Sequence, residues 1–176
     1  MKLRRIILVI GLAIVAGVFE STALTLLPWP LTAIRPILPL IVFFIVMERS
    51  PEAVLFAGMS GAVLDLFALE RSGFAVGRLI LIALLLSFLA VSILTNRSVY
   101  SAIALVWFGR SVEWGWLGLQ SRIPPYSTNA IALAPGWRDV GFSMGFDLLL
   151  ATVLFLCGIL LFRRFSVRSQ DAVSYG

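Results

Sequence analysis

Long apolar stretches separated by short polar breaks run from one end of the chain to the other. A helix needs ~20 mostly apolar residues to cross the ~30 Å hydrocarbon core of a bilayer. We expect membrane-spanning helices at residues 6–27, 34–47, 51–69, 74–94, 99–119 and 140–162. The pattern therefore predicts an all-α integral membrane protein, with six transmembrane helices in one compact bundle and a single domain over residues 1–176.

The breaks between the stretches carry turn residues. Pro28-Trp29-Pro30 follows the first stretch, and Pro51 suits the first turn of the third. A longer polar loop covers residues 120–139, and a short basic tail follows the sixth stretch. These breaks set the expected helix boundaries.

The second stretch is short for a span. At ~1.5 Å per residue, residues 34–47 do not cross the core as a straight helix. Pro36 and Pro39 lie near its start. A kink, an extension back through Leu31, or a re-entrant segment would each fit, and the sequence leaves these alternatives open.

The first stretch could instead belong to a cleaved signal, since Met1–Arg5 is basic. A signal has an apolar region of ~7–15 residues, and residues 6–27 exceed that length. We expect this stretch to remain as the first spanning helix.

The composition supports a membrane protein and narrows its chemistry. Hydrophobic residues make up 60% of the chain and charged residues only 13%, against about a quarter charged in soluble domains. Cys157 is the one cysteine and there is no histidine, so an intrachain disulfide, a thiolate metal cluster and a histidine base are excluded. The net charge of +5 comes mostly from residues at segment ends, so membrane topology explains it better than nucleic-acid binding.

The basic residues also predict the orientation. One side of the membrane would carry Lys2, Arg4, Arg5, Arg49, Arg97, Arg163, Arg164 and Arg168. The other side would carry Arg35, Arg71, Arg122 and Arg138. Lysine and arginine concentrate on the cytoplasmic side, so we expect both termini in the cytoplasm.

Ionisable residues inside the expected spans are costly and need partners. They are Glu20, Asp65, Arg78, Arg110, Glu113 and Asp147. Their distances from the helix ends place them in the outer half of the membrane, so we predict a buried polar cluster there. Arg110 would be central, with Asp65 or Asp147 as partner, whereas Glu20 and Arg78 could reach the interface by snorkelling.

The cluster has two interpretations that the sequence does not separate. It could be a structural network that fixes helix packing, or it could contact a small ligand or a partner helix. Under either one, Asp65→Ala is expected to destabilise the fold by leaving an arginine unpaired in the membrane.

Small residues at four-residue spacing predict close helix contacts. The pairs are Gly141 with Gly145, Ala13 with Gly17, and Ala57 with Gly61. They could serve internal packing or a partner helix. Catalytic, phosphate-binding and metal-ligand motifs are not found in the sequence, and we expect neither an enzyme nor a cofactor.

Two segments resemble a known family. Leu27-Pro28-Trp29-Pro30, Ile34-Arg35-Pro36 and Pro39-Leu40-Ile41 resemble the first outer loop and second span of the rod-shape-determining MreD proteins. Residues 58–67 resemble the glycine-rich third span of that family, which ends in an aspartate, here Asp65, with Gly73 following. The resemblance covers about residues 27–80, and the chain length and basic termini also fit.

This resemblance implies a non-enzymatic subunit of the cell-elongation (rod) machinery in the bacterial cytoplasmic (inner) membrane. Such proteins bind the bitopic protein MreC, and work with the MreB filament and with RodA and its class B penicillin-binding protein. Their fold is similar to the six-helix substrate-binding subunits of energy-coupling-factor transporters. The family motif falls on Arg35, Pro36, Pro39, Gly61, Asp65 and Gly73, with no catalytic role implied.

A substrate-binding subunit of a small-molecule, vitamin-type transporter is the alternative, since the same architecture and polar layer would suit it. The sequence leaves open which helices bind MreC, whether the chain forms a homo-oligomer, and whether the charge layer binds a lipid, an ion or another ligand.

Overall fold

The computed structural model describes residues 3–23, 26, 35–67, 74–92, 99–120 and 137–171. Its helices are α1 (Leu3–Val18), α2 (Ile37–Val46), α3 (Ser50–Phe67), α4 (Phe74–Ser92), α5 (Val99–Gln120) and α7 (Trp137–Asp171), and a short π-helix, η1 (Phe19–Ala23), follows α1. These described residues contain no strand. The all-helical class is therefore confirmed, and the six α-helices of the described residues fit the expected number.

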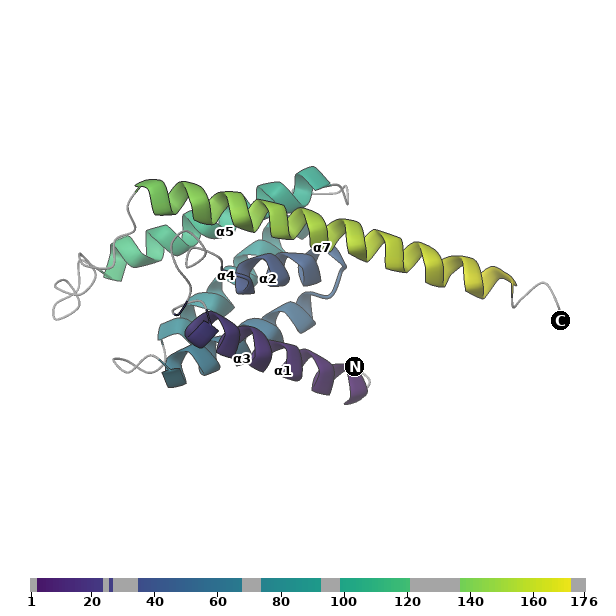
Figure 1. The fold of residues 1–176 in the computed structure, drawn as a ribbon, viewed down its shortest axis with the longest axis horizontal. Coiled ribbons are helices and arrows are strands. Elements are labelled where there is room, and N and C mark those ends of the chain that lie inside the picture. The colour runs from purple at the N-terminus through teal and green to yellow at the C-terminus, as the bar shows by residue number, and fades with distance from the viewer. Residues whose placement is uncertain are drawn as a thin grey trace.

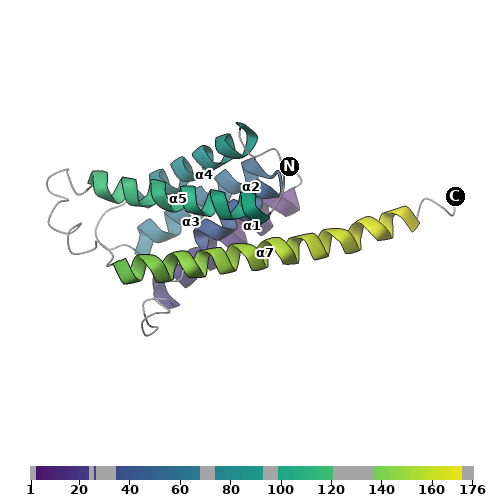
Figure 2. The same cartoon turned by 90° about the horizontal axis from the view of Figure 1, so that it is seen from above.

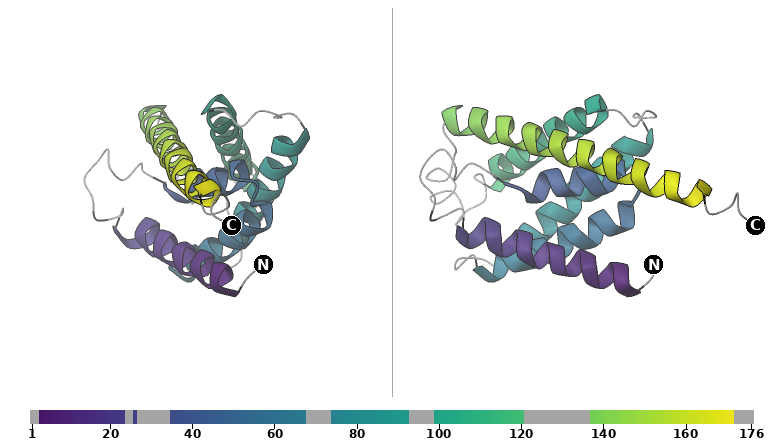
Figure 3. Two further views of the ribbon diagram at one scale, coloured as in Figure 1. Left: turned by 90° about the vertical axis from the view of Figure 1, so that its right-hand side faces the viewer. Right: turned by 45° about the vertical axis from the view of Figure 1, so that its right-hand side comes forward.

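The helices form one elongated bundle with α2 at its centre (Figures 1 and 3). Helix α2 packs against α1, α3, α4, α5 and α7. Around it, α3 packs against α1 and α4, α4 packs against α5, and α5 packs against α7. A short central helix thus joins the longer helices that surround it.

Both chain ends lie at one end of the bundle, which we call the terminal end (Figures 1 and 2). The opposite end, where α5 ends and α7 begins, is the distal end (Figure 1). An even number of antiparallel crossings returns the chain to the side from which it started. The arrangement is therefore compatible with termini on the same side of a membrane.

Helix α2 is short and almost fully buried. It has 10 residues, about 15 Å at ~1.5 Å per residue, so it cannot cross a bilayer core alone. Its composition is apolar on every face, as expected for a helix enclosed by others. The alternative of an extension back through Leu31 concerns residues outside the described ones.

The turn after α2 ends the helix in a defined way. The Glu48 backbone adopts φ 57°, the left-handed region. This conformation lets the Glu48 N–H bond the Ile45 carbonyl and the Arg49 N–H bond the Phe44 carbonyl, each at 2.9 Å. Such paired bonds satisfy the last carbonyls of a helix. The polar break expected between the second and third helices is therefore present, with Pro51 in the first turn of α3.

The sixth helix is longer than expected. Helix α7 spans 35 residues, so residues 137–139, expected in a loop, and residues 163–171, expected in a tail, are helical. The hydropathy pattern detects only the apolar part of a helix, and residues 159–171 contain no glycine or proline that would end it. The C-terminal part of α7 extends past the rest of the bundle (Figure 1).

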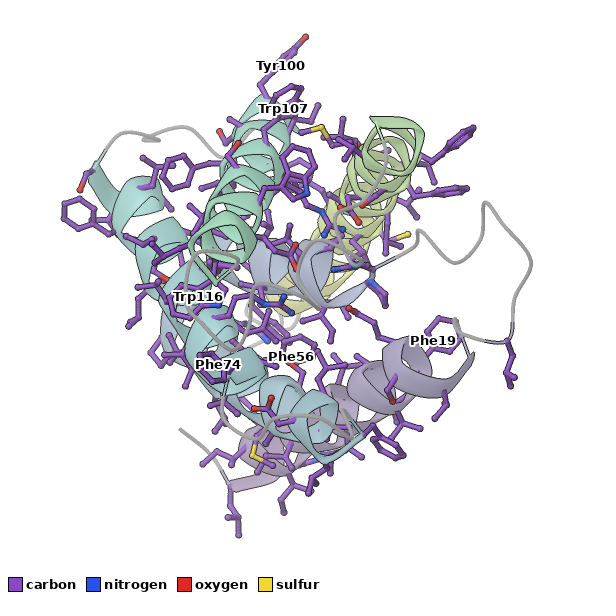
Figure 4. All side chains as sticks on the ribbon, turned by 90° about the vertical axis from the view of Figure 1, so that its left-hand side faces the viewer. Phe19, Phe56, Phe74, Tyr100, Trp107 and Trp116 are labelled. Carbon is purple, nitrogen blue, oxygen red and sulfur yellow. The ribbon has the colours of Figure 1, made fainter. Side chains whose placement is uncertain are left out.

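The surface of the bundle is strongly apolar. Tyr100, Trp107 and Phe19 point outward, whereas Phe56 lies inside (Figure 4). Three of the described helices are long and apolar enough to cross a membrane: α3, α4 and the Val140–Gly158 part of α7. A large exposed apolar surface is unfavourable in water and favourable against lipid, so these helices suit a membrane environment.

Candidate functional site

Arg110 on α5 is buried and bound to two carboxylates. Its Nε donates to Asp147 Oδ2 on α7 at 2.5 Å, and its Nη2 also contacts that oxygen. Its Nη1 donates to Glu113 Oε2, one helical turn along α5, at 2.5 Å. The side chains of Arg110 and Asp147 are only 2% and 1% exposed. A buried charge is tolerated when it is paired and hydrogen-bonded in this way, so the contact fixes α5 against α7.

Glu113 is shared by three arginines. While its Oε2 binds Arg110, its Oε1 lies 3.3 Å from Arg35 Nη1 and 3.5 Å from Arg78 Nη1. Arg35 precedes α2 and Arg78 belongs to α4. We refer to Arg35, Arg78, Arg110, Glu113 and Asp147 as the charge network. It links the start of α2 with α4, α5 and α7.

Glu20 approaches the network from η1 without a salt bridge to it. Arg35 and the backbone amide of Ile37 are both close enough to Glu20 to favour its ionised form. Its Oε2 is buried with no hydrogen-bond partner among the described residues. The π-helical turn therefore brings a carboxylate to the N-terminus of α2.

Asp65 plays a different part from the one expected. Its Oδ1 accepts a hydrogen bond from the Ala75 N–H at 3.0 Å, and its Oδ2 accepts one from the Val76 N–H at 3.1 Å. Amides in the first turn of a helix have no partner within the helix, and their partial positive charge favours a carboxylate. Asp65 therefore caps α4 and is not the partner of Arg110, whose carboxylates are Glu113 and Asp147.

Gly61 makes the capping contact possible. A Cβ at this position would lie 2.7 Å from the Val76 Cα and 2.9 Å from the Val76 N. Only a residue without a side chain allows the first turn of α4 to approach α3 so closely. Gly61 and Asp65, one helical turn apart on α3, thus dock the start of α4 together.

The other motif residues lie at the start of α2. Arg35 belongs to the charge network, Pro36 is the N-cap residue of α2, and Pro39 is buried in its first turn. Gly73 lies outside the described residues. Each described residue of the motif therefore contributes to a helix end or to a contact between helices.

Three charged side chains differ from the expectation. Arg35, assigned to the outer side of the membrane, pairs with Glu113. Arg78, expected to snorkel, has a side chain only 16% exposed and pairs with the same carboxylate. Glu52, which was not singled out, is buried near the terminal end and pairs with Arg49 at 3.5 Å. The three-residue spacing of Arg49 and Glu52 at the start of α3 could have indicated that pair.

The small-residue pairs separate into two groups. Gly17 packs against α3, where an added Cβ would lie 2.8 Å from the Val63 Cβ, and Ala57 with Gly61 is likewise buried. Gly141 and Gly145 are exposed, and a Cβ added at either one meets no described atom within 4 Å. The first group serves internal packing, and the second faces away from the bundle.

The charge network consists of arginine and carboxylate side chains, which are better suited to binding a charged group than to a chemical reaction. Among the described residues, Arg78 Nε and Asp147 Oδ1 are buried without a hydrogen-bond partner. No group of three or more histidine, cysteine, aspartate or glutamate side chains in the described ranges could hold a metal ion.

In comparisons with known protein families, curated proteins and solved structures, no match to this chain is found.

Proposed function

We propose that the chain is a non-enzymatic scaffold subunit of the bacterial cell-elongation complex, embedded in the cytoplasmic membrane. In this role it binds MreC and supports peptidoglycan synthesis and the maintenance of cell shape. RodA, its class B penicillin-binding partner and the MreB filament form the wider complex. The proposal rests on the sequence resemblance to the MreD family over about residues 27–80.

The observation that carries the proposal is what the motif residues contact. Arg35 binds Glu113, Asp65 binds the amides at the start of α4, and Gly61 allows those elements to meet. A motif used in this way holds helices together. This is what a scaffold requires, because its task is to present a defined surface to partners.

The distribution of charge supports the proposed orientation. Arg4 and Arg5 lie on α1 at the terminal end, and Arg49 lies in the turn between α2 and α3. The basic stretch of α7, residues 163–168, extends from the same end (Figure 1). Cytoplasmic faces of membrane proteins are rich in lysine and arginine, which favours the terminal end as the cytoplasmic one.

The outward side of α7 offers a surface for a partner helix. Exposed residues recur along it at about one helical turn: Gly141, Gly145, Leu149, Val153 and Leu156. We call these five residues the α7 face. Small residues let the backbone of a second helix approach closely, and the apolar residues beyond them add packing contacts. Under the proposed function, the membrane-spanning helix of MreC binds here.

The experiment that tests the proposal is affinity purification of the tagged chain from detergent-solubilised native membranes, with the recovered proteins identified by mass spectrometry. We expect MreC, with or without RodA and its penicillin-binding partner. Recovery of an energising module with paired ATPases, and no MreC, would contradict the scaffold.

That second outcome would favour the alternative function, a substrate-binding subunit of a small-molecule transporter. The observation in its favour is the set of buried polar atoms without partners near the charge network: Arg78 Nε, Asp147 Oδ1 and Glu20 Oε2. Convergent polar groups of this kind are typical of ligand sites.

A further inference from the structure

Positive charge gathers where α2 begins. Arg35 directly precedes this helix, and the N-terminus of a helix carries about half a positive charge. At the start of this short helix, Arg35 contacts Glu113 on α5, and Arg78 on α4 reaches the same carboxylate. In membrane transport proteins, short helices that end inside the bundle direct this pole at anionic groups.

The charge network carries more positive than negative charge. It contains three arginines against two carboxylates, which leaves an excess of one positive charge. Arg110 donates hydrogen bonds to Asp147 and to one oxygen of Glu113. Arg35 and Arg78 share the other Glu113 oxygen at 3.3 and 3.5 Å, longer than a typical charge-assisted bond. The excess positive charge of the network therefore resides on Arg35 and Arg78.

Arg35 and Arg78 also retain hydrogen-bonding capacity. Of the two, only Arg35 is within hydrogen-bonding geometry of Glu113 among the described residues. The Nε of Arg78 is buried without a hydrogen-bond partner. A guanidinium has five N–H donors in a planar fork that matches phosphate and carboxylate oxygens. Two such forks with unused donors, close to one shared oxygen, resemble the arrangement that holds a phosphate group.

The arginines form a gradient of exposure. The Arg35 side chain is 43% exposed, the Arg78 side chain 16% and the Arg110 side chain 2%. Arg35 could therefore meet a ligand first, with Arg78 behind it and the Arg110–Asp147 pair at the base.

We propose that Arg35 and Arg78 form a binding site for one phosphate-type anionic group at the distal end of the bundle. The group is either the headgroup of an anionic membrane lipid or a free anion, since both present the same oxygens to the arginines. This site does not depend on the scaffold function, and MreC binding and anion binding can succeed or fail separately.

Glu20 acts at this site as a built-in competitor. Its carboxyl group lies close to Arg35, yet it forms no salt bridge with any described arginine, and one of its buried oxygens has no hydrogen-bond partner among the described residues. An anion that enters the site would interact with the same Arg35 and with the same positive N-terminus of α2. Removing the Glu20 charge should therefore strengthen anion binding, whereas removing an arginine should weaken it.

The test is thermal unfolding of the full chain in a neutral detergent, followed by tryptophan fluorescence. Phosphatidylglycerol, phosphatidylcholine and inorganic phosphate are each titrated into the wild type. We expect phosphatidylglycerol to raise the midpoint saturably and phosphatidylcholine not to. A matching rise with inorganic phosphate would identify a site for the free anion, and no rise with it would identify the lipid headgroup as the source.

Variants assign the effect to the site. Arg35→Gln should weaken the apparent affinity about tenfold, the equivalent of one charge-assisted hydrogen bond. Arg49→Gln is the matched control, because Arg49 also pairs with one buried glutamate and is 38% exposed, but at the other end of α2. Arg35 tolerates substitution better than Arg78, since its side chain already reaches the surface.

Glu20→Gln should change the affinity for the anion in the opposite direction to Arg35→Gln. We expect it to bind the same anion more tightly than the wild type, by severalfold. The proposal is overturned if no anion raises the midpoint, if Arg35→Gln and Arg49→Gln respond alike, or if Glu20→Gln weakens the binding.

Discussion

At the scale of single residues, the molecule depends on how buried charges find partners. The sequence places these charges in one layer of the membrane, because depth follows from the number of residues to a helix end. It named Asp147 only as one of two alternative partners of Arg110, since the pairs depend on how each helix is rotated and tilted by packing. Arg35 joined the network and Asp65 did not, although both belong to the family motif.

Glu113 holds three arginines, so its charge should matter most. We predict that Glu113→Gln lowers the free energy of unfolding by about 3–5 kcal/mol, because it leaves buried arginines without their shared carboxylate. The measurement is unfolding in mixed detergent micelles. Glu52→Gln is the control, since it releases a single arginine that is 38% exposed, and it should cost less. Equal losses in the two variants would argue against the shared role.

The cap that Asp65 provides predicts different effects of two substitutions. Asp65→Ala should cost about 1–3 kcal/mol through the loss of bonds to the Ala75 and Val76 amides. Asp65→Asn should retain part of the stability, because its single amide oxygen can accept one of the two N–H bonds whereas its NH2 group cannot accept the other. Were Asp65 the counter-ion of an arginine, the two variants would be equally unstable, and their melting temperatures would coincide.

At the scale of helices, the boundaries with strong local signals were predictable. The Glu48–Pro51 break and the start of α4 at Phe74 agree with the sequence, because turn residues and polar breaks act locally. The extent of α7 was not predictable from hydropathy, since a helix can continue into water after its apolar part ends. The central position of α2 was not predictable from local signals either, because it depends on the packing of the whole bundle.

Two glycines on helix faces differ in their surroundings: Gly61 packs against a neighbouring helix, whereas Gly77 is exposed. Gly61→Ala should destabilise the protein by about 1–3 kcal/mol, because its Cβ would meet the backbone of Val76, which cannot move independently of α4. Gly77→Ala should be neutral or stabilise by up to ~1 kcal/mol, since Gly77 is exposed on α4 with no described atom within 4 Å of an added Cβ. Similar melting temperatures for the two variants would contradict the close approach of α3 and α4.

At the scale of the whole molecule, the apolar surface, the network and the placement of the chain ends form one arrangement. The charges gather near the distal end while the exposed helices are apolar, so a membrane could surround the bundle without contacting most of its buried charge. The number of helices and the class of fold followed from hydropathy. The partners are a proposal from the resemblance to the MreD family, since packing alone does not reveal them.

The orientation is open to a direct check. We predict that fluorescent-protein fusions at the N-terminus and at the C-terminus both fluoresce, because the basic residues at the terminal end favour the cytoplasm. Alkaline phosphatase fused at either end should be inactive. An active phosphatase at one terminus would mean an odd number of crossings.

The central claim is that this chain binds MreC, and the most direct measurement is the molar ratio of MreC that copurifies with it. The wild type and Gly77→Leu should recover MreC alike, since both retain the α7 face. Gly145→Leu should lose most of the MreC while its melting temperature stays near that of the wild type, because position 145 faces away from the bundle. Absence of MreC from the wild-type preparation, or paired ATPases in its place, would contradict the account.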